Sequence, residues 1–394
     1  MKRRLLDIVR CPIDGSAFDL EVFTSTTENF DPDKCPLRLV REMDDAALQR
    51  LYGEEILEGA LISRDAGNVY PIIAGVPRLI PHAARDYPEF FRKYRTALKG
   101  KLPDAHLAQL AGRDRRSPKS FGLQWNRYQF EDRTWFKDLA LRQREFLHSM
   151  GVARGQLAGH LVLDAGCGHG ALTAALAVHG VEAVGLDFTV AVERAQQNRA
   201  RFAGELAPFV HYIQGDLLQP PLAPECFDHA HSSGVIHHTP DPRGAFASLV
   251  RVTRPGGRVY VQVYRKRERW VAVSNAIVRA VTTRLPPRLL WALCLPAVPV
   301  HTVLVYLVAA LRHERPMLAD STLRERAVSL FDNFSPRYQF RYRPEEIRQF
   351  FVDSGLGEIE DTTLANEMRH MVAFVGVKPP VRVPVKAGAK MATA

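Results

Sequence analysis

One ten-residue stretch, from Leu161 to Gly170, constrains the fold of this chain more than any other. It reads Leu-Val-Leu-Asp-Ala-Gly-Cys-Gly-His-Gly, and helix-forming residues follow at 171–178. The apolar run predicts a buried strand, and glycines permit a sharp turn and the close approach of a ligand to the main chain. The N–H groups at the start of the next helix favour a carboxylate or phosphate. The stretch therefore predicts a strand, a ligand-binding loop and a helix.

Two cofactors suit this loop on the residues alone. Gly166, Gly168 and Ala171 satisfy the dinucleotide pattern G-x-G-x-x-G/A, and Asp187 stands where that pattern requires a ribose ligand. NAD is therefore open at this point. Asp164, at the end of the predicted strand, favours a different ligand, because its carboxylate would repel a pyrophosphate and attract an ammonium group such as that of S-adenosylmethionine.

From residue 161 onward, predicted strands alternate with predicted helices. After the first strand and helix, strands are expected at 181–186, 209–214, 227–231 and 258–263, with helices at 190–202 and 243–253. Such alternation indicates parallel strands joined by right-handed crossovers. The fold class is therefore α/β, a doubly wound sheet with its ligand at the carboxyl ends of the strands.

Five motifs, in order along the chain, resemble those of the class I methyltransferases, and more closely their small-molecule type 11 branch. They are Asp164-Ala-Gly-Cys-Gly-His-Gly170, Gly185-Leu-Asp187, Gly215-Asp216, Ser-Gly-Val-Ile-His-His-Thr-Pro-Asp-Pro at 233–242 and Arg-Pro-Gly-Gly-Arg-Val at 254–259. Ordered matches are far more specific than one glycine loop. The resemblance covers about residues 121–377 and implies a Rossmann-like seven-stranded sheet, with strands at 357–361 and 370–377 as an antiparallel edge pair.

The resemblance implies a role for each motif residue in holding S-adenosylmethionine. Asp164 would help neutralise the ammonium group, Asp187 would accept from the ribose hydroxyls, and Asp216 would accept from the adenine amino group, with Leu217 against the ring. Gly166 and Gly168 would let the amino-acid part approach the main chain. The predicted cofactor-binding residues are Gln124, Asp164, Gly166, Cys167, Gly168, Asp187, Phe188, Asp216, Leu217 and Ser233.

Two further segments bear on the chemistry. Gln124 and Trp125 resemble a lid segment that folds over the cofactor, although aromatic packing at a helix start explains them equally well. A general base is needed only if the acceptor must lose a proton, and His237 or His238, after the fourth strand, could serve. A packing role is favoured over catalysis for either histidine alone. We name His237 as the catalytic candidate.

Residues 1–82 predict a small β-rich module. Two apolar strands flank an Asp-Ala-Gly-Asn turn at 65–68. The module resembles a zinc-ribbon-derived family that activates certain tRNA and translation-factor methyltransferases. A zinc ribbon needs two Cys-x-x-Cys knuckles, but Asp14 stands at the second knuckle position after Cys11, and residues 61–70 contain no cysteine. We therefore expect a module without metal, held together by its apolar core.

The expected domain divisions follow from these features. They are a β-rich module at 1–82, a polar linker with a short helix at 83–120, a methyltransferase-like domain at 121–377 and a disordered tail at 378–394.

An insert at 266–342 interrupts the alternation of strands and helices. Its apolar stretch at 289–311 is long enough for a transmembrane helix, but Pro296, Pro299 and His301 lie mid-span. Two shorter helices that cap the active site are favoured over membrane contact.

Composition limits the partners and the compartment. The net charge is +10, but the basic clusters at 113–119 and 265–269 lack the interleaved aromatic residues of a single-strand nucleic-acid platform. A soluble basic surface is therefore favoured over nucleic-acid binding. The five scattered cysteines do not suggest a disulfide framework. Asp7, Arg10 and Asp14 interrupt the apolar core that a signal peptide would need after its basic start. We expect a cytoplasmic protein, with contact to a membrane left open.

Several functions remain at this point. The first is S-adenosylmethionine-dependent methyl transfer to a small metabolite, apolar or lipid-linked. The second is methylation of RNA, in particular tRNA, or of protein, with the activator-like module fused in cis. A membrane-surface scaffold that binds the cofactor without catalysis is a third. NAD-dependent oxidoreduction is a minor alternative, because Asp216 and the Pro255-Gly-Gly turn have no role in it. The sequence predicts nothing about the oligomeric state.

Overall fold

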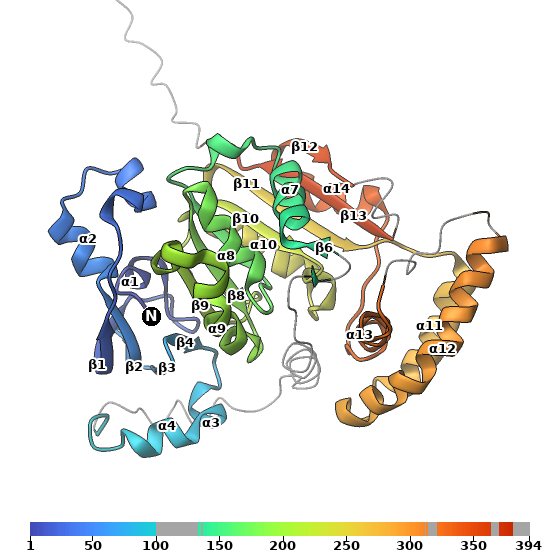
Figure 1. Ribbon diagram of the computed structural model, residues 1–394, viewed down its shortest axis with the longest axis horizontal. Coiled ribbons are helices and arrows are strands. Elements are labelled where there is room, and N and C mark those ends of the chain that lie inside the picture. The colour runs from blue at the N-terminus through green and yellow to red at the C-terminus, as the bar shows by residue number, and fades with distance from the viewer. Residues whose placement is uncertain (100–132, 135–136, 312, 314–320, 364–369, 381–394) are drawn as a thin grey trace, which may run out of the picture.

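One twisted sheet of 11 strands runs through the molecule in the order β1-β2-β3-β4-β9-β8-β7-β10-β11-β13-β12 (Figure 1). The structure is a computed structural model, and it describes residues 1–99, 133–134, 137–311, 313, 321–363 and 370–380. A separate two-residue hairpin joins β5 (Arg133–Thr134) to β6 (Lys137–Asp138).

The larger part of the sheet confirms the predicted doubly wound fold. Its parallel strands, in spatial order, are β9 (Val210–Gly215), β8 (Glu182–Asp187), β7 (Leu161–Ala165), β10 (Phe227–Ser233) and β11 (Thr253–Tyr264). The edge is an antiparallel pair, β13 (Met371–Val377) and β12 (Gly357–Asp361), as the resemblance implied. The strand ends carry the predicted motif residues, so this part of the sheet positions the site.

Helices cover both faces of this part of the sheet. On one face, α7 (Leu139–Met150) and α8 (Ala171–Leu176) pack on the strands, and α9 (Ala191–Ala203) lies beside α8. The other face is covered by α10 (Pro242–Val252) and α14 (Pro344–Asp353). Short 3-10 turns complete the connections: η1 (Pro32–Lys34), η2 (Pro36–Leu39), η3 (Arg154–Gln156), η4 (Ala177–His179), η5 (Gly204–Phe209) and η6 (Ile236–His238).

The N-terminal module continues the same sheet. Its strands β1 (Phe18–Thr27), β2 (Glu54–Ser63), β3 (Val69–Ile73) and β4 (Val76–Leu79) are antiparallel to one another, and its helices are α1 (Leu5–Ile8) and α2 (Asp45–Tyr52). β4 pairs in parallel with β9, with Arg78 opposite Gln214 and Leu79 opposite Gly215. The sequence predicted the module but not this pairing. Two short helices follow, α3 (Ala83–Asp86) and α4 (Pro88–Lys93).

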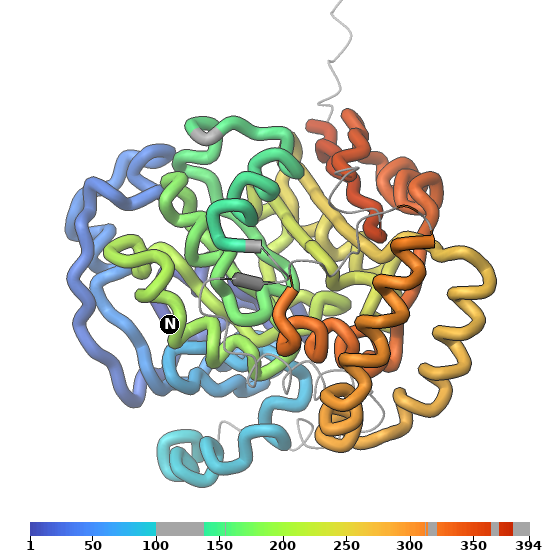
Figure 2. The backbone as a smooth tube through the Cα atoms, turned by 45° about the vertical axis from the view of Figure 1, so that its right-hand side comes forward, coloured from blue at the N-terminus to red at the C-terminus, as the bar shows by residue number. Residues whose placement is uncertain are grey.

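The insert forms three helices on the side of the molecule away from the N-terminal module (Figures 1 and 2). They are α11 (Arg269–Thr282), α12 (Pro287–Leu311) and α13 (Leu323–Phe334). The prediction of two short helices separated at the prolines is wrong, because α12 is continuous for 25 residues with Pro296 and Pro299 inside it. A proline removes one backbone donor, but the remaining hydrogen bonds of so long a helix can hold it together across the two sites.

Candidate active site

The loop after β7 turns through glycines that no other residue could replace without strain. Gly166 has φ +85°, and a Cβ there would lie 2.2 Å from Cγ2 of Val235, in the loop after β10. Gly170 has φ +75°, and its Cβ would lie 2.6 Å from the ring of Tyr212. Positive φ and these close approaches both require glycine. The loop is therefore packed closely against β9 and the loop after β10.

Asp187, the last residue of β8, holds this loop in place through a hydrogen bond. Its Oδ2 accepts a hydrogen bond from the N–H of Gly168 at 3.0 Å, and its Oδ1 accepts from the N–H and the hydroxyl of Thr189 at 2.8 and 2.7 Å. Burial raises the pKa of Asp187, these hydrogen bonds oppose the rise, and the nearby Asp164 carboxylate adds to it. Because a carboxylate oxygen can accept two hydrogen bonds, Oδ2 retains capacity for a ligand hydroxyl.

Asp164 is buried and partly committed to the protein. Its Oδ2 accepts from the hydroxyl of Thr173 on α8 at 2.6 Å, and its Oδ1 lies 3.5 Å from Nδ1 of His231. Arg142, on α7, is half-buried within electrostatic reach of Asp164. Burial lowers the pKa of Arg142, and Asp164 opposes that shift. The carboxylate of Asp164 and the guanidinium of Arg142 therefore lie close together beside the glycine loop.

Arg142 and Thr173 belong to none of the sequence motifs. Thr173 belongs to α8, and its sequence context predicts only the helix that follows the glycine loop. Arg142 lies some 20 residues before the first motif, and no pattern connects it to the loop. Its position one turn before the buried Phe146 on α7 is the only signal that could have placed it near the sheet.

The remaining predicted cofactor residues follow the neighbouring strands. Asp216 comes directly after β9, is half-buried, and accepts from the N–H of Leu218 at 2.9 Å. Leu217 beside it is buried. Ser233, the last residue of β10, is exposed, and its hydroxyl donates to Oε1 of Gln262 at 2.8 Å. The carboxyl ends of the central strands therefore bring these residues to one edge of the sheet.

Phe188 follows β8, and Cys167 belongs to the glycine loop after β7. Phe188 is half-buried, and its carbonyl accepts from Nε2 of Gln214 at 3.1 Å. Tyr87, which follows α3, donates through its hydroxyl to Oε1 of the same Gln214. The N-terminal part of the chain thus supports the loop after β8. Burial, with Asp187 and Asp164 nearby, raises the pKa of the Cys167 thiol, so this cysteine is a poor nucleophile.

His237 is fully buried in the turn η6 after β10. Its ring lies 4.2 Å, centroid to centroid, from the rings of both His238 and Tyr264. Neither of its ring nitrogens has a hydrogen-bond partner among the described residues. Burial lowers the pKa of His237 well below its usual value, and the charges of His238 and Arg341 lower it further. The imidazole is therefore neutral at neutral pH.

Tyr264 joins this turn to the insert. Its hydroxyl donates to Oδ2 of Asp332 on α13 at 2.7 Å, and Nδ1 of His238 lies 3.0 Å from the carbonyl of Tyr338. The predicted lid residue Gln124 and its neighbour Trp125 lie outside the described residues. In the described ranges, no group of three or more His, Cys, Asp or Glu side chains is arranged to hold a metal.

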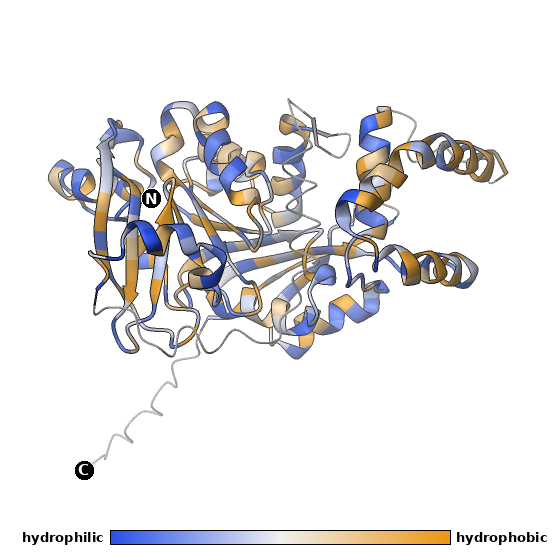
Figure 3. Cartoon of the chain, turned by 90° about the horizontal axis from the view of Figure 1, so that it is seen from below, coloured by the Kyte–Doolittle hydropathy of each residue, from blue (hydrophilic) through white to orange (hydrophobic). Residues whose placement is uncertain are grey.

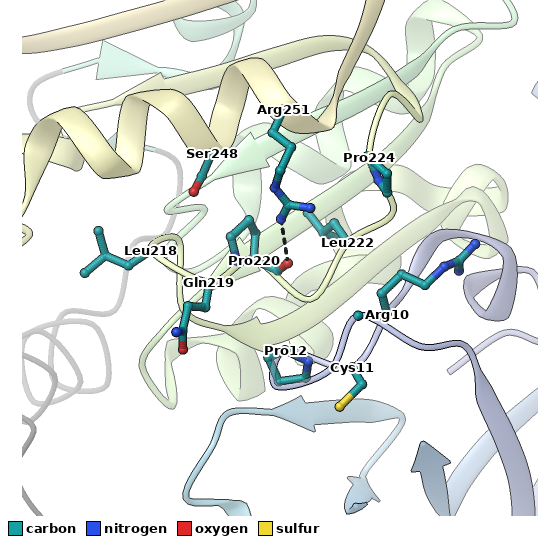
Figure 4. Close-up of a pocket in the computed structure, with 11 residues that line it drawn as sticks. Arg10, Cys11, Pro12, Leu218, Gln219, Pro220, Leu222, Pro224, Ser248 and Arg251 are labelled. Atoms are coloured by element: carbon teal, nitrogen blue, oxygen red, sulfur yellow. Dashed lines mark hydrogen bonds between the residues drawn. The ribbon is translucent and has the colours of Figure 1, made fainter. Parts of the chain in front are cut away.

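A cavity of about 290 Å³ lies elsewhere (Figure 4). It is lined by Arg10 and Cys11 of the N-terminal module, by Leu218 and Gln219 after β9, and by Arg251 of α10. Asp164, Asp187 and the glycine loop do not line it. The cavity is therefore a gap at the junction of the two parts, distinct from the edge that carries the motif residues.

Two parts of the chain match known families. Residues 163–261 match the family described as "Methyltransferase domain", and residues 2–75 match the family described as "Trm112p-like protein". The chain contains a methyltransferase domain and a Trm112p-like domain. The match to the methyltransferase domain begins in β7 and ends in β11, so it covers the strands whose ends form the site.

Curated relatives of the methyltransferase domain include enzymes named for quinone biosynthesis. The chain is 33% identical over 107 residues to a ubiquinone biosynthesis O-methyltransferase of Pseudomonas syringae pv. tomato, covering 27% of this chain and 45% of the relative. It is 31% identical over 109 residues to a demethylmenaquinone methyltransferase of Renibacterium salmoninarum, covering 28% and 43%. The match thus spans about half the length of these relatives.

Solved structures with a partial likeness include two of interest. One is a complex of the Haloferax volcanii Trm112 methyltransferase activator with a methyltransferase, at 17% identity and a TM-score of 0.36, covering 68% of this chain and 100% of the other. Another is Haemonchus contortus phosphoethanolamine N-methyltransferase 2, at 14% identity and a TM-score of 0.39, covering 73% and 60%.

Proposed function

We propose that the methyltransferase domain binds S-adenosylmethionine and transfers its methyl group to a small apolar acceptor. One observation carries this proposal. Asp164, Asp187 and Asp216 stand at the carboxyl ends of three adjacent strands, around a loop whose glycines leave its main chain open to a ligand. Three acids in a row suit a ligand that offers an ammonium group, a ribose and an adenine, and they disfavour a pyrophosphate.

The residues present fit this cofactor. Asp164 and Arg142 would face the ammonium and carboxylate of its amino-acid part, since the two side chains carry opposite charges at the same end of the loop. Asp187 Oδ2 would accept from a ribose hydroxyl, and Asp216 would accept from the adenine amino group. Phe188, Leu217 and Cys167 supply apolar contacts between these groups. Once bound, the cofactor supplies a methyl group activated by its sulfonium.

His237 is the proposed base if the acceptor must lose a proton. Neither ring nitrogen has a partner in the described residues, so the unprotonated one would accept the proton of an acceptor hydroxyl that reaches it. The lowered pKa keeps the imidazole neutral but makes it a weak base. The protein's other contribution is to hold acceptor and methyl group in line. The names of the curated relatives, which refer to ubiquinone and demethylmenaquinone, support a phenolic ring with an apolar tail as the acceptor class.

The Trm112p-like domain supports a second candidate. Its resemblance to methyltransferase activators, together with the net charge of +10, favours RNA or protein as the acceptor. In this alternative the Trm112p-like domain would activate the methyltransferase domain of the same chain.

Calorimetry with S-adenosylhomocysteine, beside NADH, tests the cofactor. We expect S-adenosylhomocysteine to bind the full chain, and Asp187→Asn to weaken binding by about 10-fold or more, because a hydrogen bond to a charged group is lost. Asp353→Asn removes an exposed carboxylate on α14 and is the matched control. Binding of NADH alone, or equal effects of the two variants, would contradict the proposal.

The acceptor class is tested with S-adenosylmethionine labelled on its methyl group. The chain is incubated with a prenylated hydroquinone, with bulk tRNA and with a protein extract in separate reactions. Label in the organic extract supports the small apolar acceptor, whereas label in precipitated RNA or protein supports the second candidate.

A further inference from the structure

Helix α11 is packed with its polar side inward. Arg279 donates from Nη1 to the carbonyl of Asn333 at 2.5 Å, and the hydroxyl of Thr282 donates to the carbonyl of Phe334 at 3.0 Å, so the polar face rests on the end of α13. The opposite face carries Trp270, Val273, Ile277 and Val281, which are 60%, 53%, 66% and 63% exposed. These positions recur at helical spacing and form one apolar stripe. No residue of α11 is buried.

Helix α12 adds a second apolar surface. Leu290, Cys294 and Val298 pack on α13, but its most apolar 18-residue window is only 17% buried and has a mean hydropathy of 2.0. The exposed apolar side chains include Leu293, Val300, Val303, Leu304, Leu307 and Leu311. Figure 3 shows the two helices extending from one side of the molecule, with much of their length hydrophobic. So large an apolar surface indicates an interaction site rather than a solvated one.

The charges of this helix pair identify what covers it. Between residues 269 and 311 the sequence contains no Asp or Glu, and it carries arginines at 269, 279, 284 and 288. The acid Glu268 is the N-cap of α11, and Arg265, Lys266 and Arg267 precede it. Arg279 is bound to α13, so the exposed charges are those of Arg269, Arg284 and Arg288, with the single acid Glu268 at the N-terminal edge. Apolar faces with this excess of positive charge fit an anionic lipid surface, since arginines lie at the headgroups while apolar side chains enter the acyl region. A protein partner gives no reason for the absence of acids from residues 269–311.

We propose that α11 and α12 bind the protein to the surface of an anionic lipid bilayer. The helices lie in the interface and do not cross the membrane, although α12 is long enough to do so. The reason is α13, which packs along α12 with Glu325 and Arg326 in its first turns, and Arg326 donates to the hydroxyl of Thr302 at 3.1 Å. A spanning α12 would carry these charges into the hydrocarbon.

The lipid-binding surface of α11 and α12 lies near the turn after β10, which carries the proposed base His237. Asp332 of α13 accepts from Tyr264, whose ring contacts His237, so one helix separates the lipid-facing surface from the turn after β10. This part of the inference rests on the proposed function: an apolar acceptor would reach the site from the bilayer and would not have to cross water. Binding to lipid itself does not depend on catalysis.

Co-sedimentation of the full chain with vesicles tests the proposal. We expect binding to vesicles of phosphatidylcholine mixed with phosphatidylglycerol, and weaker binding to phosphatidylcholine alone. Ile277→Asp with Val281→Asp should lower the partition coefficient at least about 10-fold, because each side chain otherwise enters the apolar region. Arg284→Glu with Arg288→Glu should lower it about fivefold or more per arginine on anionic vesicles only. Val178→Asp, at a side chain 56% exposed on η4, is the matched control and should leave binding unchanged.

Each other outcome is decisive. A wild-type chain that stays in the supernatant with both vesicle types overturns the proposal, as does equal binding by the Ile277→Asp, Val281→Asp variant. If light scattering shows a dimer that this variant dissociates, and no vesicle binding, the face pairs with a second copy. S-adenosylhomocysteine calorimetry on the same samples separates the two proposals. A chain that binds this ligand but no vesicle supports the proposed function alone. A chain that binds vesicles but not this ligand supports lipid binding alone.

Discussion

Arg4 and Glu182 are 178 residues apart in sequence, yet Nε of Arg4 donates to Oε2 of Glu182 at 3.1 Å inside the molecule. Arg4 precedes α1 of the Trm112p-like domain, and Glu182 begins β8 of the methyltransferase domain. The hydroxyl of Tyr52 also donates to Glu182 at 2.7 Å, and Nε2 of His211 lies 3.0 Å away. Glu182 is almost completely buried. A buried charge network therefore joins the two domains.

Removing Arg4 should loosen that junction. We expect Arg4→Ala to lower the free energy of unfolding by about 3 kcal/mol or more, because it leaves the buried Glu182 carboxylate without its cation. Arg3→Ala is the control, since the ion pair of Arg3 with Glu54 is partly exposed and should contribute less than about 1 kcal/mol. Urea unfolding monitored by tryptophan fluorescence measures both. Equal losses would show that the network does not hold the domains together.

The same network predicts a dependence of stability on pH. The charge of Arg4 and the contact with His211 outweigh burial and lower the pKa of Glu182 from 4.5 to about 2. A folded-state pKa below the unfolded value stabilises the protein above pH 4.5, and this contribution is lost as pH falls towards the folded pKa. About 2 kcal/mol should be lost between about pH 6 and pH 3.

Urea unfolding of the wild type and of Glu182→Gln at these two pH values isolates that contribution. The stability difference between the two proteins should shrink at the lower pH, because glutamine does not titrate. A difference that stays constant would mean that Glu182 titrates alike in the folded and unfolded chain.

Arg142 should contribute to cofactor affinity. Arg142→Ala would remove the cation that faces the carboxylate of the ligand, and we expect S-adenosylhomocysteine affinity to fall about 10- to 100-fold. Arg144→Ala, on the exposed side of the same helix, should leave affinity unchanged. Isothermal calorimetry distinguishes them. If both variants bind normally, the acid at Asp164 recognises the amino-acid part without Arg142.

His237→Gln should separate catalysis from binding. If His237 is the base, turnover falls about 100-fold or more while S-adenosylhomocysteine affinity holds. The pKa of His237 is lowered, so its imidazole stays neutral as pH falls through 6.5, and the wild-type rate should show no acid limb there. His148→Gln, at an exposed position of α7, is the control. Unchanged turnover would leave His237 with a packing role.

Much of the methyltransferase domain could be predicted from sequence because its signals are local. The apolar runs, the glycine loop and the strand-end acids each occupy a few consecutive residues, and parallel topology then brings Asp164, Asp187 and Asp216 to one edge. The pairing of β4 with β9 left no such trace, because two residue pairs far apart in the chain create no period or motif. Arg142 could not be predicted either, because no local sequence pattern connects it to the glycine loop.

The insert shows a different limit. Pro296 and Pro299 predict a break in the helix from local sequence. Helix α12 nevertheless packs along α13 through Leu290, Cys294 and Val298. Tertiary contacts of this kind override local helix propensity. The sequence also showed that the stretch was apolar without showing which face would find a partner. That depends on α11 and α13, whose arrangement only the structure provides.

The pairing of β4 with β9 has a consequence for synthesis on the ribosome. Arg78 and its partner Gln214 are separated by 136 residues, so at about 5–20 residues per second β4 emerges roughly 7 to 27 seconds before the strand it will join. During that interval its backbone is an open edge. Arg78, fully buried in the finished protein, then places a charge on that edge, which discourages pairing with neighbouring nascent chains until β9 arrives.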